Sequence, residues 1–251
     1  MRSPPVALTI AGSDCSSGAG AQADLKTFTA LGVYGLTAIT CVVAETPGKV
    51  TQIQPVDAEV VEEQMTLLLD AFPVGAIKTG MLFSAEIVAL VARLLRDRGI
   101  PVVVDPVMVA TSGDLLLKRE AVAVYERDLF PRAALITPNL DEAATLLGRR
   151  IPGLAAMRIA GQELARRYNV PVLLKGGHLQ GENAVDLLCT TRGVREFSAK
   201  FDHEVYTHGT GCTYSAAIAA ALASGLPLEE AVERGKRFVT AAITQHFEWT
   251  G

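Results

Sequence analysis

Short, almost uninterrupted runs of apolar residues alternate with longer segments of helical periodicity along most of this chain. The apolar runs predict strands at 6–10, 37–43, 75–78, 102–105, 133–137 and 172–175. The segments between them predict helices at 21–31, 58–71, 85–97, 118–129, 140–147 and 154–168. Strands that are apolar on both faces are typical of a parallel sheet with helices on each side. The alternation therefore predicts an α/β fold with a doubly wound, mostly parallel sheet and right-handed crossovers.

The pattern changes in the last third of the sequence. Segments 184–189 and 194–199 flank the turn Thr191-Arg192-Gly193 and predict an antiparallel hairpin at an edge of the sheet. Two helices are expected after it, at 211–224 and 228–247. No Gly/Ser-rich linker and no internal repeat interrupts the sequence, so we expect a single domain over residues 1–251.

Composition and charge exclude several classes of protein. Hydrophobic residues make up 49% of the 251, too many for a disordered chain. The net charge of −4 gives no electrostatic reason to bind nucleic acid or an anionic membrane surface. No apolar run approaches the roughly 20 residues that span a bilayer. The four cysteines form no Cys-x-x-Cys pair, which favours reduced thiols in a cytoplasmic protein.

Residues suited to chemistry follow each expected strand. Ligands of a doubly wound sheet bind beyond the carboxyl ends of its strands. The segments at those ends are 11–20, 44–48, 79–81, 105–109, 137–142 and 175–178. Glycine and proline are ordinary turn residues, so any one of these loops is weak evidence by itself. Their grouping at one edge of the sheet favours a ligand site there.

One glycine pattern resembles a dinucleotide-binding loop. Gly18, Gly20 and Ala23 have the spacing of that fingerprint, and Glu45 stands where its ribose-binding acid would be. However, seven residues separate Ile10 from Gly18, whereas the fingerprint needs its glycines in the turn directly after the strand. The spacing therefore argues against a nicotinamide-dependent oxidoreductase.

The sequence Thr207-His208-Gly209-Thr210-Gly211-Cys212 opens an apolar helix and predicts an anion site. Glycines at a helix start let backbone N–H groups converge on an anion, which the helix dipole also favours. Such a site suits a phosphoryl group in transfer. We expect the same field to lower the pKa of the Cys212 thiol. The alternative is an ordinary glycine-containing cap with a small buried cysteine.

Oxygen ligands for a divalent cation stand at two neighbouring strand ends. Asp105, Asn139 and Glu142 could hold Mg²⁺ together with substrate phosphates. Glu142 would alternatively only favour the first turn of its helix. Lys175 ends a buried strand, where either a nucleotide phosphate or a structural carboxylate would satisfy its charge. No Gly-x-x-x-x-Gly-Lys-Ser/Thr motif is present, so a P-loop kinase is excluded.

Taken together, these motifs resemble the hydroxymethylpyrimidine/phosphomethylpyrimidine kinases of thiamine biosynthesis, within the ribokinase-like superfamily. Six ordered segments carry the resemblance: 7–14 (ALTIAGSD), 18–26 (GAGAQADLK), 105–113 (DPVMVATSG), 137–140 (TPNL), 175–178 (KGGH) and 207–212 (THGTGC). The resemblance runs from about Val6 to the final helix. It implies a ribokinase-like fold, ATP as phosphoryl donor and Mg²⁺ as cofactor.

The resemblance also implies roles for individual residues. It places Gly12, Ala19, Asp24, Met81 and Val107 in the pyrimidine pocket. Gly209, Gly211 and Cys212 would form the anion hole, with Cys212 where sugar kinases of the superfamily carry an aspartate base. Asn139 and Glu142 match the magnesium-linked Asn-x-x-Glu of the superfamily. Lys175 and Thr207 would contact the nucleotide.

Glu45 departs from the family pattern, which usually has a pyrimidine-binding glutamine at this position. A carboxamide both donates and accepts hydrogen bonds, whereas an ionised carboxylate only accepts. One mismatched buried hydrogen bond is worth about 1–3 kcal/mol. A second departure is Ser17-Gly18, where the family usually has two glycines.

The sequence therefore predicts ATP-dependent phosphorylation of 4-amino-2-methyl-5-pyrimidinemethanol phosphate to the diphosphate, with Glu45 favouring the monophosphate over the free alcohol. A pyridoxal or pyridoxine kinase is the main alternative, because Glu45 suits a protonated pyridinium nitrogen. A ligand-binding regulator on a kinase scaffold is another. The expected partner is a small pyrimidine, with neither nucleic acid nor membrane, and the edge hairpin would allow a homodimer.

Overall fold

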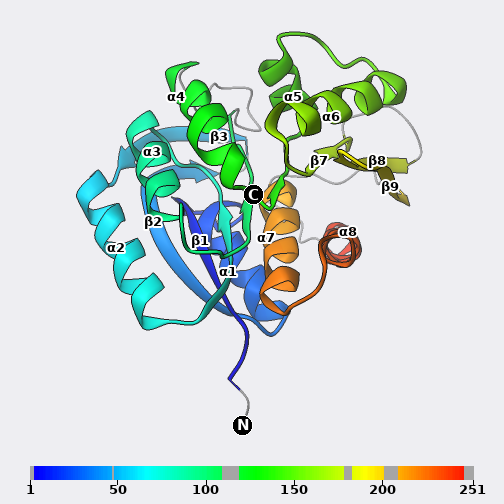
Figure 1. Cartoon of the computed structure of the whole chain (residues 1–251). Coiled ribbons are helices and arrows are strands. Elements are labelled where there is room, and N and C mark those ends of the chain that lie inside the picture. Colours follow the sequence, from blue (N-terminus) through cyan, green and yellow to red (C-terminus); the bar gives the residue numbers. More distant parts are fainter. Residues whose placement is uncertain (1–2, 47, 109–118, 178–182, 201–208, 246–251) are drawn as a thin grey trace.

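All strands described in the computed structural model belong to one sheet (Figure 1). The structure describes residues 3–46, 48–108, 119–177, 183–200 and 209–245. The strands are β1 (Val6–Asp14), β2 (Tyr34–Thr46), β3 (Lys49–Pro55), β4 (Val74–Thr79), β5 (Val102–Val104), β6 (Leu135–Ile136), β7 (Val172–Lys175), β8 (Asn183–Thr190) and β9 (Gly193–Lys200). Their order across the sheet is β3-β2-β1-β4-β5-β6-β7-β8-β9.

The sheet is parallel in its centre and antiparallel at both edges. Within the row β2-β1-β4-β5-β6-β7, each pair of adjacent strands is parallel. At one edge β8 and β9 form the predicted antiparallel hairpin, and β7 also pairs antiparallel with β8. At the other edge β3 pairs antiparallel with β2, which the sequence did not predict. β3 is mostly exposed and polar, so it lacks the apolar run by which the buried strands were found.

The helices lie close to their predicted positions. They are α1 (Gly20–Ala30), α2 (Ala58–Ala71), α3 (Ala85–Leu94), α4 (Arg119–Val124), α5 (Leu140–Leu147), α6 (Leu154–Tyr168), α7 (Thr210–Ala223) and α8 (Leu228–Thr244). After α4 the chain continues through a π-helical turn, η1 (Tyr125–Leu129), and a 3-10 turn, η2 (Phe130–Arg132). The predicted α/β class, with helices on both faces of a mostly parallel sheet, is confirmed.

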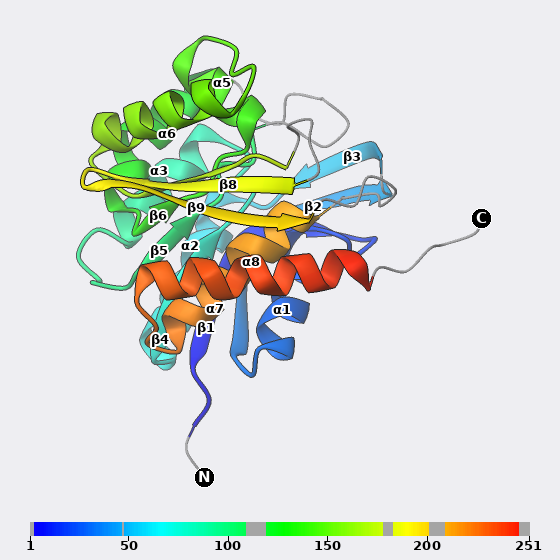
Figure 2. The same ribbon diagram turned by 90° about the vertical axis from the view of Figure 1, so that its right-hand side faces the viewer.

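The helices form two layers, one on each face of the sheet. Helices α1, α7 and α8 lie on one side, and α2, α3, α5 and α6 lie on the other (Figure 2). Neighbouring strand residues serve opposite layers: Leu173 packs with the α7 side, whereas Leu174 packs with the α6 side. The strands are therefore apolar throughout, because both of their faces are buried.

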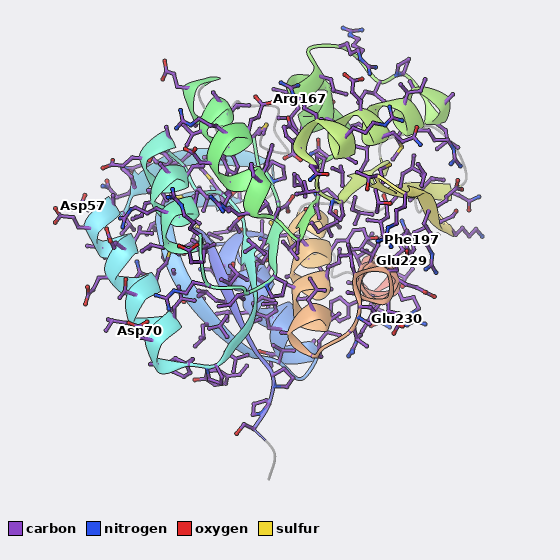
Figure 3. All side chains as sticks on the ribbon, viewed as in Figure 1. Asp57, Asp70, Arg167, Phe197, Glu229 and Glu230 are labelled. Atoms are coloured by element: carbon purple, nitrogen blue, oxygen red, sulfur yellow. The ribbon has the colours of Figure 1, made fainter. Side chains whose placement is uncertain are left out.

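Charged side chains lie on the outside of these layers. Asp57, Asp70 and Glu230 project outward from the ends of their helices (Figure 3). No helix in the described ranges is long and apolar enough to cross a membrane. Cys15, Cys41, Cys189 and Cys212 are free thiols.

Two consequences of the topology matter for a site. The carboxyl ends of the parallel strands share one edge of the sheet, and α7 begins beside them.

Candidate active site

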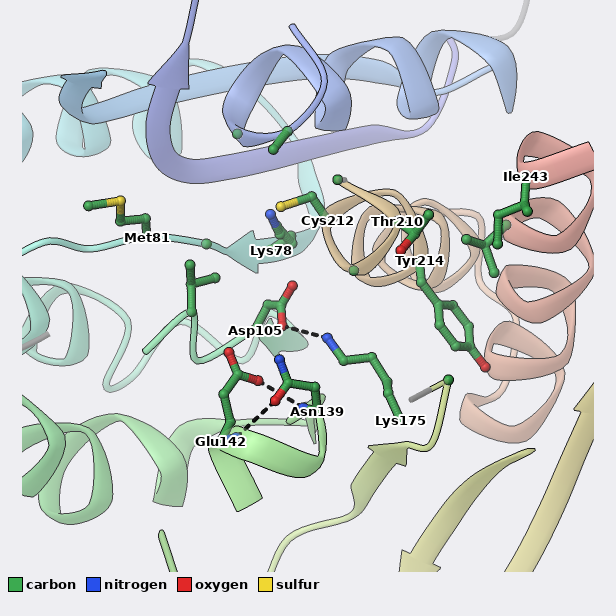
Figure 4. Close-up of a pocket in the computed structure, with 18 of the residues that line it drawn as sticks. Lys78, Met81, Asp105, Asn139, Glu142, Lys175, Thr210, Cys212, Tyr214 and Ile243 are labelled. Atoms are coloured by element: carbon green, nitrogen blue, oxygen red, sulfur yellow. Dashed lines mark hydrogen bonds and ion pairs between the residues drawn. The ribbon is translucent and has the colours of Figure 1, made fainter. Parts of the chain in front are cut away.

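A cavity of about 460 Å³ lies at the carboxyl ends of the parallel strands and extends along the start of α7 (Figure 4). The predicted site residues that line it are Gly12, Ala19, Glu45, Met81, Asp105, Val107, Asn139, Glu142, Lys175, Gly209, Gly211 and Cys212. The fold thus brings together residues from the ends of several strands and from one helix start. Thr207, predicted to contact the nucleotide, lies outside the described residues.

The cavity has two ends with different chemistry. Residues at the ends of β1, β2 and β4, among them Gly12, Glu45 and Met81, line one end. The other end lies between β8, β9 and the last helix, with Asp186, Tyr214 and Ile243 in its wall. Asp105, Lys175 and the first turn of α7 lie between them (Figure 4). The helix start therefore lies between the two ends of the cavity.

The loop after β1 is fixed by a buried carboxylate. Asp14 is 1% exposed and accepts hydrogen bonds from the Ser16 and Ala19 amides, each at 2.7 Å. The loop then touches the start of α7, because Gly209 lies against the carbonyl group of Gly18. A Cβ atom at Gly209 would overlap that carbonyl, and Gly209 also has a φ of 79°. Only glycine meets both conditions without strain.

Asp24 does not line the cavity, so that part of the predicted pyrimidine pocket is corrected. Its carboxylate is fully buried beneath the floor, where Thr9 donates a hydrogen bond of 2.6 Å to it. The ammonium group of Lys78 forms an ion pair with it at 2.8 Å. Both carboxylate oxygens are therefore occupied by the protein.

Asp105 and Lys175 form an ion pair of 3.0 Å at the centre of the cavity (Figure 4). Thr137 and Ser215 also donate hydrogen bonds to the Asp105 carboxylate, at 3.2 and 3.0 Å. Burial alone would raise the pKa of Asp105, but the ammonium groups of Lys175 and Lys78 hold it below its usual value. Asp105 is thus the structural carboxylate that satisfies Lys175, and this occupation argues against its predicted role as a metal ligand.

Lys175 also lies beside the helix start. A Cβ atom at Gly211 would be 3.3 Å from the Lys175 ammonium nitrogen. The first N–H groups of a helix have no carbonyl partner within that helix. The cavity covers Gly209 to Cys212, so backbone dipoles and the Lys175 charge favour an anion at the same place.

Asn139 and Glu142 form a capping box at the start of α5. The Asn139 side chain accepts a hydrogen bond from the Glu142 amide, and the Glu142 carboxylate accepts one from the Asn139 amide, both at 2.8 Å. The second Glu142 oxygen accepts the Met108 amide at 3.3 Å. Burial raises the pKa of Glu142 to about 7, although Lys175 opposes the shift. Glu142 therefore caps the helix, as the alternative interpretation predicted, and it also lines the cavity.

The described residues contain no cluster of three histidine, cysteine, aspartate or glutamate side chains that would hold a metal directly. Mg²⁺ usually keeps several waters and binds one or two carboxylates together with substrate phosphates. Glu142 could be such a carboxylate, because its oxygens retain lone pairs and it lies near the place where Lys175 and the start of α7 favour an anion. Asn139 fits less well, since its amide oxygen is already used by the cap.

The Cys212 thiol differs from expectation. Burial raises the pKa of Cys212, and Lys78, the strongest opposing influence, does not reverse the shift. The predicted lowering of its pKa by the helix start is therefore wrong. The helix start can be recognised in the sequence, but the burial of the sulfur atom, which raises the pKa, cannot.

Glu45 projects into the cavity from the end of β2 and is half-buried. Its backbone contacts Cys15, whose thiol donates a hydrogen bond of 3.2 Å to the Glu45 carbonyl oxygen. Burial, with a further contribution from Asp14, raises the pKa of the Glu45 carboxyl to about 7. Near neutral pH a substantial fraction of Glu45 is therefore protonated, and this form both donates and accepts hydrogen bonds.

Several charged residues at the cavity were missed in the sequence. Lys78, Asp186 and Lys236 line it, and the last two form an ion pair of 2.7 Å. The signal for Lys78 was available, because it interrupts the apolar strand β4 as Lys175 ends another. The Tyr214 hydroxyl is buried without a hydrogen-bond partner among the described residues. Nothing in the alanine-rich sequence around Tyr214 indicates that it lines a cavity.

Comparison with known proteins finds similar chains. A family described as phosphomethylpyrimidine kinase matches residues 14–250. The hydroxymethylpyrimidine/phosphomethylpyrimidine kinase of Rhizobium meliloti is 48% identical over 240 residues, which cover 95% of this chain and 90% of that protein.

Two solved structures are similar throughout. The ADP complex of Bacillus subtilis pyridoxal kinase has a TM-score of 0.92 and 39% identity, covering 99% of this chain and 95% of that one. Phosphomethylpyrimidine kinase from Clostridium difficile has a TM-score of 0.84 and 39% identity, covering 95% of this chain and 99% of that one.

Proposed function

The chain belongs to the phosphomethylpyrimidine kinase family and is a kinase, and we propose that its acceptor is 4-amino-2-methyl-5-pyrimidinemethanol phosphate. ATP is the donor that the relatives support, since a similar kinase was solved with ADP bound. The product would be the diphosphate used in thiamine biosynthesis. The observation that carries the proposal is one cavity whose two ends meet at Lys175 and the start of α7.

The acceptor end of the cavity suits a small aromatic ring. Gly12, Ala19, Met81 and Val107 line it, and together they offer apolar surface and little bulk. We place the pyrimidine there, with its phosphate directed toward Gly209, Gly211 and Cys212. The nucleotide then occupies the end near Asp186 and Tyr214. Lys175 lies between the two and can contact the phosphates of either ligand.

In the transfer, an oxygen of the substrate phosphate attacks the γ-phosphorus of ATP. The new P–O bond forms as the bond to the β,γ-bridging oxygen breaks, and ADP leaves with the electron pair. The amides at the start of α7 and the Lys175 ammonium stabilise the charge on the phosphoryl oxygens. When bound, Mg²⁺ would neutralise charge on the ATP phosphates. Glu142, at the cavity wall, would hold it.

The raised pKa of Cys212 supports a preference for the monophosphate over the free alcohol. A phosphate oxygen is largely ionised at pH 7 and needs no base, whereas an alcohol must lose its proton. A thiol that resists ionisation is a poor base for that step. Glu45 adds to this above about pH 7, because its ionised form then mismatches the ring and lowers binding, while the monophosphate keeps its contacts with the helix start.

A comparison of the two acceptors tests this function. Purified protein with ATP and Mg²⁺ is expected to convert the monophosphate with a higher kcat/KM than the alcohol. Glu45→Gln is the matched variant, because it keeps side-chain size and restores the carboxamide. Equal kcat/KM values of wild type for both acceptors would refute the preference, and no turnover of either would refute the assignment of substrate.

A pyridoxal or pyridoxine kinase is the second candidate. It is supported by Glu45, whose carboxylate suits a protonated pyridine nitrogen, and by the likeness to the Bacillus subtilis pyridoxal kinase. Assaying pyridoxal and pyridoxine beside the two pyrimidines separates the candidates. A kcat/KM for pyridoxal above that for the pyrimidine monophosphate would favour the second.

A further inference from the structure

A buried lysine in the cavity wall is a charged group that the proposed reaction does not yet use. Lys78 lies in β4, and its side chain has no solvent-exposed surface. Its ammonium group donates to both carboxylate oxygens of Asp24, at 3.0 and 2.8 Å. Burial alone would lower the pKa of Lys78, but Asp24 raises it above its usual value. The ion pair therefore favours the charged form of Lys78.

The fold determines where this cation points. Thr9 and Lys78 are register partners in β1 and β4, so their side chains leave the same face of the sheet. Thr9 donates a hydrogen bond to Asp24, which comes from α1. Helix α1 packs against α7 on that face. The three side chains consequently hold one another under the first turn of α7.

Space for the ammonium group depends on Gly80. A Cβ atom there would lie 2.9 Å from the Lys78 nitrogen and 3.0 Å from the Ala11 side chain. An ammonium group has three donors, and Asp24 takes two of them. Asp24 does not take the third, and the charge of Lys78 acts on the Cys212 sulfur at the start of α7 (Figure 4).

We propose that Lys78, held by Asp24, is a positioning residue for Cys212, whose thiolate it stabilises and whose sulfur it directs toward the acceptor hydroxyl. This inference rests on the proposed kinase function. In phosphorylation of the free alcohol, the thiolate takes the hydroxyl proton. The alcohol oxygen then bonds to the γ-phosphorus as the β,γ-bridging bond breaks and ADP leaves.

Other charged groups also act on Cys212. Asp24 and Asp105 disfavour its thiolate, whereas Lys175 favours it. The amide of Gly20 donates a hydrogen bond to the sulfur and favours the thiolate as well. The two lysines balance the two aspartates in charge, so a thiolate is an additional negative charge. Removing Lys78 would leave that charge without its strongest support.

The experiment follows alkylation of Cys212 by iodoacetamide as a function of pH in the full chain. Cys15 is exposed and is replaced in all samples by Cys15→Ser; Cys212→Ala supplies the blank. The test variant is Lys78→Met with Asp24→Asn, which removes both charges and keeps the side-chain sizes. The control is Thr9→Val, which removes a hydrogen bond from the same cluster but leaves both charges in place.

We expect the double variant to move the alkylation midpoint to higher pH. At a fixed pH below the midpoint, a midpoint that is higher by one pH unit slows alkylation about tenfold. Thr9→Val should keep the wild-type midpoint. The kcat for the alcohol should fall in the double variant while KM for ATP is unchanged. A loss of structure would lower turnover of both acceptors and expose all cysteines. It would therefore not produce a higher alkylation midpoint together with a lower kcat for the alcohol and an unchanged KM for ATP.

A folded double variant with the wild-type midpoint would overturn the proposal. If that variant does not fold, Lys78→Met with Asp24→Leu fills the site with apolar volume and gives the same comparison. The double variant could show a higher midpoint while the wild-type protein phosphorylates neither pyrimidine. That result would support the effect of Lys78 on Cys212 and refute the proposed function.

Discussion

The ammonium group of Lys236 and the carboxylate of Asp186 form a buried ion pair of 2.7 Å that joins α8 to β8. Asp186 also accepts the Gly176 amide at 2.9 Å, and Lys236 also donates to the Ala184 carbonyl oxygen at 3.0 Å. One pair thus ties together the last helix, the edge hairpin and the loop after β7. All three border the end of the cavity proposed for the nucleotide.

Lys236→Met should destabilise the protein by about 3–5 kcal/mol, because it leaves the Asp186 carboxylate buried without its cation. Urea unfolding measures the change in the free energy of unfolding. Glu229→Gln is the control, since Glu229 also links α8 to the hairpin, through Arg195, but that pair is exposed. Its loss should cost about 1 kcal/mol or less. Equal costs for the two variants would contradict a special role for the buried pair.

Gly209→Ala should abolish phosphoryl transfer, because the added methyl group overlaps the Gly18 carbonyl and displaces the helix start. Steady-state kinetics with ATP and the pyrimidine monophosphate measure the loss. Gly225→Ala is the matched control. Gly225 has a similar φ of 84° but no atom within 4 Å of a Cβ, so it carries the backbone strain, about 1 kcal/mol, without the overlap. An active Gly209→Ala enzyme would show that the contact with Gly18 is dispensable.

Binding of the pyrimidine should weaken as pH rises through about 7. The pKa of Glu45 is raised to about 7, so Glu45 is protonated below that pH and can donate to a ring nitrogen. Above it, Glu45 is ionised and repelled by the ring lone pair and by Asp14. The KM of the monophosphate should therefore increase across this range in wild type. Glu45→Gln does not titrate and should lose this dependence; an unchanged profile in that variant would assign the titration to another group.

Cys212→Ala should reduce kcat for the alcohol more than kcat for the monophosphate, although by less than the roughly 10²-fold that a well-ionised base contributes. The reason is that only the alcohol must lose a proton. Parallel assays with both acceptors measure the difference. Cys189→Ala, at a buried thiol that does not line the cavity, controls for loss of a cysteine in general. Equal losses on both acceptors would instead give Cys212 a binding role.

The sequence predicted the centre of the fold well, because strands buried on both faces appear as apolar runs such as Val172–Lys175. It did not reveal β3, whose residues are mostly exposed and mostly polar. Glycine-marked loops identified most of the cavity wall for a related reason: close backbone approach leaves glycines in the sequence. Partnerships between distant charges leave no such mark. Asp24 and Lys78 are 54 positions apart, and neither residue alone indicates the other.

The ionisation of the site residues was the least predictable property. The helix start near Cys212 was visible in the sequence, but burial of the sulfur outweighs the field that it supplies. Glu45 shows the same limit, since its raised pKa follows from enclosure and from Asp14, which lies 31 positions earlier. Environment, and not residue type, decides the charge of both groups.

Val107 holds a φ of 39°, in the left-handed region that β-branched residues rarely adopt. Such a conformation costs about 1–3 kcal/mol, and here it belongs to a residue of the cavity wall. Selection for thermal stability alone would therefore favour Val107→Gly. That substitution would relax the backbone, but it would also remove apolar surface beside the acceptor. Thermal stability would then rise while affinity for the acceptor ring falls.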